Sequence, residues 1–125
     1  MGTTTPAAEL VERQVDGLNK GNIDDIVSIY SGDARLHLVS PHTLPGSELA
    51  LEGVDKIRRH MERVLKGGIA GVEIEWLGAG DGFLAWRDSG TFGTEIRFSE
   101  SHSAVLDDSG KVVEHWIHSV YARGQ

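Results

Sequence analysis

The stretch KVVEHWIHSVYA, residues 111–122, decides the fold. It follows DDSG (residues 107–110), whose composition is typical of a hairpin turn, and it is rich in the β-branched and aromatic residues that favour strands. In a helix, His115 and His118 would share one face. In a strand, alternate side chains point to opposite faces, so only one of the two can face a buried site. The sequence therefore predicts a final strand that places His115 and His118 on opposite faces of the sheet.

The second half of the chain before this stretch also has the patterns of strands. Branched and aromatic residues alternate with polar ones, and glycine-rich turns separate the segments. The four consecutive strands are expected at residues 69–78, 82–92, 94–106 and 111–122, after an earlier strand at residues 34–40. Residues 41–53 contain two prolines and two glycines, and we expect a loop there.

Three segments have the apolar spacing of helices. The first covers residues 7–20, with Thr5 as its N-cap and Pro6 at its first position. The second, capped by Asn22, is expected over residues 22–31 with Tyr30 on its apolar face. The third covers residues 54–66 and ends at two glycines.

The order of these elements predicts an α+β fold in one domain, residues 1–125. The connections between the strands are too short for crossovers, so the sheet should be mostly antiparallel. We expect a cone-shaped, curved sheet wrapped on three helices, with an internal pocket.

Composition excludes several classes of function. The 125 residues carry 12 basic and 19 acidic side chains, a net charge of −7, which disfavours nucleic acid as a partner. There is no cysteine, no apolar run long enough for a membrane helix and no signal peptide pattern, so we expect a cytoplasmic protein. The histidines lack the spacing of metal ligands and there is no nucleotide-binding motif, so we expect no metal and no cofactor.

Four segments together resemble the nuclear transport factor 2-like superfamily, in its SnoaL-like and ketosteroid-isomerase-like branch. They are LNKGNIDDIVSIYSGDARLHLVSP (residues 18–41), Gly53, the pair Ile57-Arg58, and GKVVEHW (residues 110–116). The resemblance covers nearly the whole chain and implies the cone-shaped fold. It does not imply one activity, because this fold carries isomerases, cyclases, dehydratases, epoxide hydrolases and non-enzymes.

The resemblance also shows where this chain departs from its relatives. In ketosteroid isomerases a tyrosine and two aspartates stand at the positions that match Gln14, Leu38 and His102, so the steroid-isomerase set is absent. In SnoaL-like cyclases a histidine matches His102, whereas an aspartate stands where this chain has Ile117.

The resemblance implies that inward-facing residues of the last strands converge on the pocket. The expected catalytic residues are Asp88, His102 and His115. The expected substrate-binding residues are Tyr30, Gln14, Trp86, Leu38, Ile117 and Ser119. Glu100 is expected on the inner face without a role, and His37 at the rim. A histidine titrates near neutral pH, and a buried carboxylate beside it fixes its tautomer, so an Asp88–His102 pair can serve as acid or base.

The alternative to a functional role is that these residues only pack the core of the protein. Trp76, Trp116 and His118 are expected on the outer face of the sheet, where relatives commonly form homodimers; His42 and His60 are expected in solvent. Two functions remain open at this point. The first is a cofactor-independent cyclase, isomerase or epoxide-opening enzyme acting on a small hydrophobic metabolite, in a natural-product pathway. The second is a non-catalytic binding or assembly module.

Overall fold

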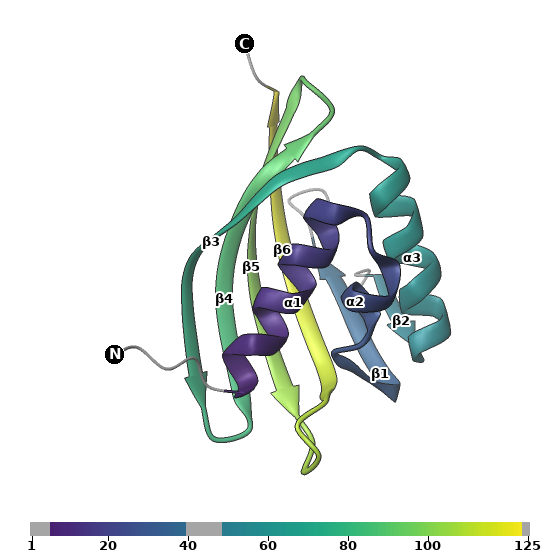
Figure 1. The fold of residues 1–125 in the computed structure, drawn as a ribbon, viewed down its shortest axis with the longest axis vertical. Coiled ribbons are helices and arrows are strands. Elements are labelled where there is room, and N and C mark those ends of the chain that lie inside the picture. Colours follow the sequence, from purple (N-terminus) through teal and green to yellow (C-terminus); the bar gives the residue numbers. More distant parts are fainter. Residues whose placement is uncertain (1–5, 40–48, 124–125) are drawn as a thin grey trace.

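One curved sheet of six strands forms the frame of the protein in a computed structural model that describes residues 6–39 and 49–123 (Figure 1). The strands lie in the order β2-β1-β6-β5-β4-β3. Their bounds are β1 Tyr30–Val39, β2 Leu49–Glu52, β3 Ile69–Gly80, β4 Phe83–Phe92, β5 Ile96–Leu106 and β6 Val112–Arg123. Only the β1–β6 pair is parallel within this sheet; the other neighbours are antiparallel, as the short connections predicted.

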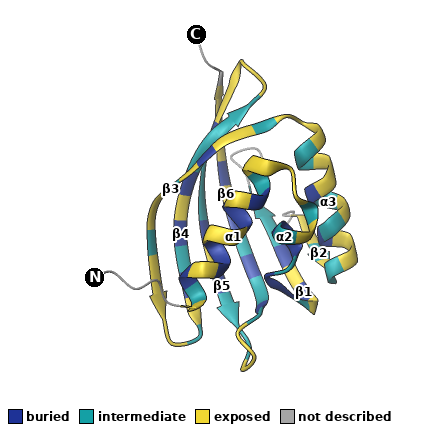
Figure 2. Cartoon of the chain, in the orientation of Figure 1, coloured by how far each residue is buried: buried dark blue, intermediate teal, exposed yellow. Residues whose placement is uncertain are grey.

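Three helices cover the concave face of the sheet (Figure 1). They are α1 Pro6–Lys20, α2 Ile23–Val27 and α3 Val54–Lys66. Buried residues alternate with more exposed ones along the strands (Figure 2), and the buried apolar residues of the helices and strands form one core cluster. The predicted α+β fold with a curved, mostly antiparallel sheet is therefore confirmed.

The end of α1 is attached to the sheet by a side chain rather than by backbone pairing. The Asn19 side-chain amide donates to the carbonyl of Val72 (2.9 Å) and accepts from its N–H (2.8 Å). The pairing of β3 with β4 shifts register between Ala70 and Glu73, so Asn19 satisfies a backbone position in that irregular segment. This contact fixes α1, and with it Gln14, over the inner face of the sheet.

The second helix is shorter than predicted, and Tyr30 belongs to a strand. The helix α2 ends at Val27, and the carbonyl of Ile29 accepts a hydrogen bond of 2.8 Å from Val112 of β6. Tyr30 then pairs with Val112 in the sheet. The prediction of Tyr30 on a helix was wrong because pairing with a distant strand outweighs the local helical spacing of this segment.

The predicted loop at residues 41–53 contains a strand at its end. Leu49–Glu52 forms β2, which pairs antiparallel with β1, for example Leu51 with Leu36. The sequence LALE has no strong strand preference, so its conformation depends on the neighbour it pairs with. The expected cap at Thr5 and the expected exposure of His42 lie outside the described residues.

The outer face carries the aromatic residues that were expected there. Trp116 stacks on His37, with ring centroids 5.2 Å apart, and His37 contacts Glu114 at 2.6 Å. Trp76 is 50% exposed and His118 is exposed. Dimerisation through this face stays a prediction. Within residues 6–39 and 49–123, no helix is long and apolar enough to cross a membrane.

Candidate functional site

A cavity of about 320 Å³ lies between the helices and the inner face of the sheet. Most of its wall is apolar, and the polar side chains are few. The helices contribute Gln14, Leu18, His60, Met61 and Val64. The strands contribute, among others, Leu38, Glu100, His102, Ile117 and Ser119. Its volume is at the lower end of the range for small-molecule sites.

The structure divides the nine predicted site residues into two layers. Those that line the cavity are Gln14, Leu38, His102, Ile117 and Ser119. Those buried outside its lining are Tyr30, Trp86, Asp88 and His115. Strand register explains the grouping, because Asp88 pairs with Glu100, Trp86 with His102 and Ile117 with His102 across neighbouring strands.

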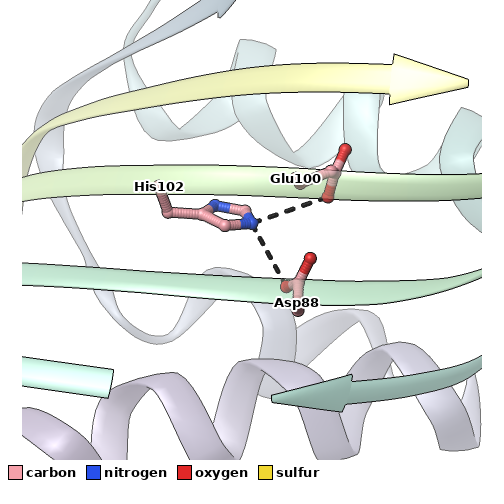
Figure 3. A group of neighbouring side chains, drawn as sticks. All are labelled: Asp88, Glu100 and His102. Carbon is pink, nitrogen blue, oxygen red and sulfur yellow. Dashed lines mark ion pairs between the residues drawn. The ribbon is translucent and has the colours of Figure 1, made fainter. Parts of the chain in front are cut away.

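Two carboxylates flank one nitrogen of a buried imidazole (Figure 3). His102 Nε2 lies 3.1 Å from Asp88 Oδ2 and 3.6 Å from Glu100 Oε1. Neither contact has the geometry of a hydrogen bond, so the nitrogen lies between two carboxyl groups without a close partner in the described part of the chain. Ser119 Oγ donates to the other oxygen of Glu100 at 2.9 Å, and Trp86 stacks on the His102 ring at 4.4 Å between centroids. These contacts hold both Glu100 and His102 in position.

The other nitrogen of His102 begins a buried chain of hydrogen bonds. His102 Nδ1 lies 2.9 Å from His115 Nε2, and His115 Nδ1 lies 2.7 Å from the Tyr30 hydroxyl. At the far end, Gln14 Nε2 lies 3.0 Å from the Tyr30 oxygen and 3.3 Å from the carbonyl of Ile26. We call this chain, Gln14–Tyr30–His115–His102, the buried relay.

The carbonyl of Ile26 gives the buried relay a direction. This carbonyl can only accept, so the Gln14 nitrogen faces it and donates to the Tyr30 oxygen as well. The Tyr30 hydroxyl then donates to His115 Nδ1, and neutral His115 carries its proton on Nε2 and donates to His102 Nδ1. Neutral His102 therefore carries its own proton on Nε2, between the two carboxylates.

Burial and charge shift the pKa values of these groups in different directions. Burial lowers the pKa of His115 well below 6.5, and the positive charge that His102 can carry lowers it further, so His115 is neutral. Burial also raises the pKa of the Tyr30 hydroxyl. Tyr30 and His115 thus remain neutral, and they influence which nitrogen of His102 carries the proton without carrying a charge themselves.

His102 itself is subject to opposing influences. Burial disfavours its charged form, but the contacts and negative charges of Asp88 and Glu100 outweigh burial and raise the pKa of His102 to about 8. Burial raises the pKa of Asp88, whose Oδ1 has no hydrogen-bond partner in the described part of the chain. The cluster can therefore hold or release a proton near neutral pH.

The same three side chains offer donor atoms that a divalent cation could use. One ligand atom each from Asp88, Glu100 and His102 lies within 4.8 Å of the others. A histidine that binds a metal through Nε2 must lose the proton there and donate from Nδ1. The direction of the buried relay favours the opposite tautomer, so this arrangement suits a proton better than a cation.

Sequence reasoning missed the roles of two cavity residues. Glu100, expected on the inner face without a role, lines the cavity and is the more accessible carboxylate of the cluster, with 18% of its side chain exposed against 3% for Asp88. His60 was expected in solvent, but it is half-buried and lines the cavity. The signal was its position three residues after Ile57 and four before Val64, on the apolar side of the helix.

Comparison with known proteins establishes the family. The family model of the SnoaL-like domain matches residues 11–115, so the chain belongs to the SnoaL-like family. No curated protein matches the chain significantly.

Solved structures with the same fold include proteins with and without a stated activity. A SnoaL-like protein of unknown function from Burkholderia thailandensis has a TM-score of 0.74 and 20% identity, covering 98% of this chain and 99% of that one. SalBIII, an epoxide hydrolase/cyclase-like enzyme of pyran ring formation in the polyether salinomycin, has a TM-score of 0.73 and 17% identity, covering 95% and 91%. A steroid delta-isomerase from Pseudomonas aeruginosa has a TM-score of 0.67 and 14% identity, covering 92% and 80%. These likenesses describe the fold.

Proposed function

We propose that this protein is an acid/base enzyme that transfers a proton within a small apolar carbonyl compound, as an isomerase or a cyclase does. One observation carries the proposal. The wall of an otherwise largely apolar cavity presents the Glu100 carboxylate beside the His102 imidazole, with Asp88 behind them. Structural ion pairs can have the same composition, but here two members of the cluster face a cavity of ligand size.

Glu100 has the position of the group that exchanges the proton with the ligand. Its carboxylate would take a proton from a carbon next to the carbonyl group: the C–H bond breaks, an O–H bond forms on Glu100, and the electron pair passes into an enolate. Where a C=C bond is conjugated with the enolate, return of the proton from Glu100 to the far carbon of that bond isomerises the compound. Attack of the enolate carbon on a carbonyl carbon in the same molecule closes a ring, and the proton then passes from Glu100 to the resulting alkoxide oxygen. Each step uses side chains of the chain alone.

His102 and Asp88 would hold a second proton beside the Glu100 carboxylate. His102 Nε2, which carries the proton in the neutral ring, lies 3.6 Å from Glu100 Oε1 and 3.1 Å from Asp88 Oδ2. After proton transfer, His102 lies between the Asp88 carboxyl group and the newly neutral Glu100. The buried relay keeps the proton of neutral His102 on Nε2, the nitrogen that faces Asp88 and Glu100.

A non-catalytic binding module is the second candidate, and one observation favours it. Leu38 and Ile117 stand where ketosteroid isomerases and SnoaL-like cyclases have acidic residues, and both line the cavity. An enzyme of this chain must therefore rely on Asp88, Glu100 and His102 instead. Binding without proton transfer would support the module.

Hydrogen–deuterium exchange separates the two candidates. 2-Tetralone, a small apolar ketone with exchangeable protons beside its carbonyl, is incubated with the protein in D₂O and followed by proton NMR. We expect exchange above the buffer rate and a loss of about 10²- to 10⁴-fold in Glu100→Gln, the usual contribution of a general base. The matched control is Glu73→Gln, an exposed glutamate on β3. Two results would refute the proposed enzyme: binding of 2-tetralone without exchange of its protons, or an exchange rate in Glu100→Gln equal to that of the wild type.

A further inference from the structure

The helical wall of the cavity contains a histidine that the acid/base cluster does not use. His60 lies on α3 between Ile57 and Val64, and the spacing of three and four residues places all three on the side of the helix that faces the sheet. Met61 next to it is buried, and His60, Met61 and Val64 together line the cavity. An imidazole here stands in an apolar surface on the wall contributed by the helices, whereas Glu100 belongs to the wall contributed by the sheet.

His60 is available to a ligand as a hydrogen-bond donor, whereas the amide nitrogen of Gln14, the other polar side chain of the helical wall, is not. The Gln14 amide nitrogen is committed to the carbonyl of Ile26 and the hydroxyl of Tyr30. His60 forms no hydrogen bond and no ion pair with any residue of 6–39 and 49–123. A half-buried imidazole in an apolar wall loses hydration, and a ligand that supplies a hydrogen-bonding atom restores what was lost.

The surroundings of His60 keep it neutral and couple it to the opposite wall. Burial lowers the pKa of His60, and the charge of Arg63, one turn further along α3, lowers it as well. The charge of Glu100 acts in the opposite direction, so the two groups interact across the cavity. A neutral imidazole donates a hydrogen bond through one nitrogen without bringing a charge into the apolar space.

We propose that His60 donates a hydrogen bond to the carbonyl oxygen of the ligand and so orients it, with the adjacent carbon directed toward Glu100. The ligand class is then a small apolar ketone rather than a hydrocarbon or a charged acid. A neutral histidine can polarise a carbonyl group in this way while a carboxylate removes the neighbouring proton. The direction of the reacting carbon rests on the proposed function, but the hydrogen bond itself requires only that the ketone binds.

A pair of ligands that differ by the oxygen tests the inference. The binding of 2-tetralone and of tetralin, its hydrocarbon counterpart, is measured by calorimetry or by competition with a fluorescent apolar probe. His60→Leu should weaken 2-tetralone binding by about 3- to 10-fold, the effect of one neutral hydrogen bond, and leave tetralin binding within about twofold. His118→Leu is the matched control, since His118 is exposed on the last strand and does not line the cavity.

A second variant and the exchange assay complete the design. His60→Gln retains an N–H donor and should bind 2-tetralone more tightly than His60→Leu does, which guards against a purely structural effect of leucine. If His60→Leu weakens both ligands equally, or neither, the inference is overturned. If the ketone preference depends on His60 but wild-type protein does not exchange the protons of 2-tetralone, the inference stands and the proposed enzyme fails.

Discussion

Replacing Tyr30 by phenylalanine tests whether the buried relay controls the proton on His102. In the wild type, the Tyr30 hydroxyl donates to His115 Nδ1 and thereby keeps the proton of His115 on Nε2, where it faces His102. The variant retains the aromatic ring but removes this donor. His115 is then free to carry its proton on either nitrogen.

The size of the effect follows from counting hydrogen bonds. A protonated His102 carries N–H on both nitrogens, so His115 Nε2 must accept and its Nδ1 must donate to Tyr30. The Tyr30 oxygen would then receive two donors, and its own O–H would lose its partner. One neutral hydrogen bond contributes about 0.5–1.5 kcal/mol, which corresponds to about 0.4–1.1 in a pKa. In the variant, His115 Nδ1 lacks this partner whether His102 is neutral or protonated, so protonation of His102 leaves no additional group unpaired. The pKa of His102 should therefore rise above its wild-type value of about 8.

Nitrogen-15 NMR of the imidazole rings measures both the tautomers and the titration. Tyr121→Phe serves as the control, because Tyr121 is 49% exposed and its hydroxyl makes no hydrogen bond with the described residues. We expect His115 in the wild type to be protonated on Nε2 above pH 8, and His102 to titrate at higher pH only in Tyr30→Phe. A His115 protonated on Nδ1, or an unchanged or lower pKa of His102 in the variant, would refute the direction assigned to the relay.

Two further predictions concern stability. Folding raises the pKa of His102 from 6.5 to about 8, so its stabilisation is complete below pH 6.5 and is lost as the pH rises through 8. Urea titrations should show the free energy of unfolding falling by about 2 kcal/mol between pH 6.5 and 9, and His102→Gln should remove most of this slope; a flat wild-type profile would contradict the assignment. A Cβ atom on Gly90 would lie 2.8 Å from the Phe98 ring and 3.0 Å from the carbonyl of Ala70. Gly90→Ala should therefore lower the free energy of unfolding by about 1–3 kcal/mol in the same titrations, whereas Gly78→Ala, with its nearest atom 4.0 Å away, should change it little, and equal effects would show that the contact does not matter.

Most of the fold could be predicted because alternating side chains and turn residues identify its strands from local sequence alone. In the segment from Glu114 to Ser119, alternation separates His115 from His118 and the family resemblance directs His115 inward, and the structure has His115 buried and His118 exposed. Tyr30 could not be placed this way, because the segment before it is equally suited to a helix and pairing with Val112 decides between the two. Local patterns identify the strands but not which distant strand each one joins.

The site could be predicted only in part for a related reason. Asp88, Glu100 and His102 lie on two strands, and their convergence depends on a register in which Asp88 stands opposite Glu100. A register changed by two residues would keep every side chain on its face and yet separate the cluster. His60 was misplaced because a polar residue beside an apolar one on a helix was assigned to solvent, although the turn of the helix brings both to the cavity wall.

The position of β6 has a consequence for how the protein folds. This strand lies between β1 and β5, so the N-terminal strands can join the rest of the sheet only through the segment that is most distant from them in sequence. A chain that has emerged only as far as β5 holds two separate pieces of sheet and none of the contacts between Tyr30 and His115. Such long-range closure is slow compared with hairpin formation. The step that completes the sheet therefore also assembles the polar interior, and partly folded molecules lack both together.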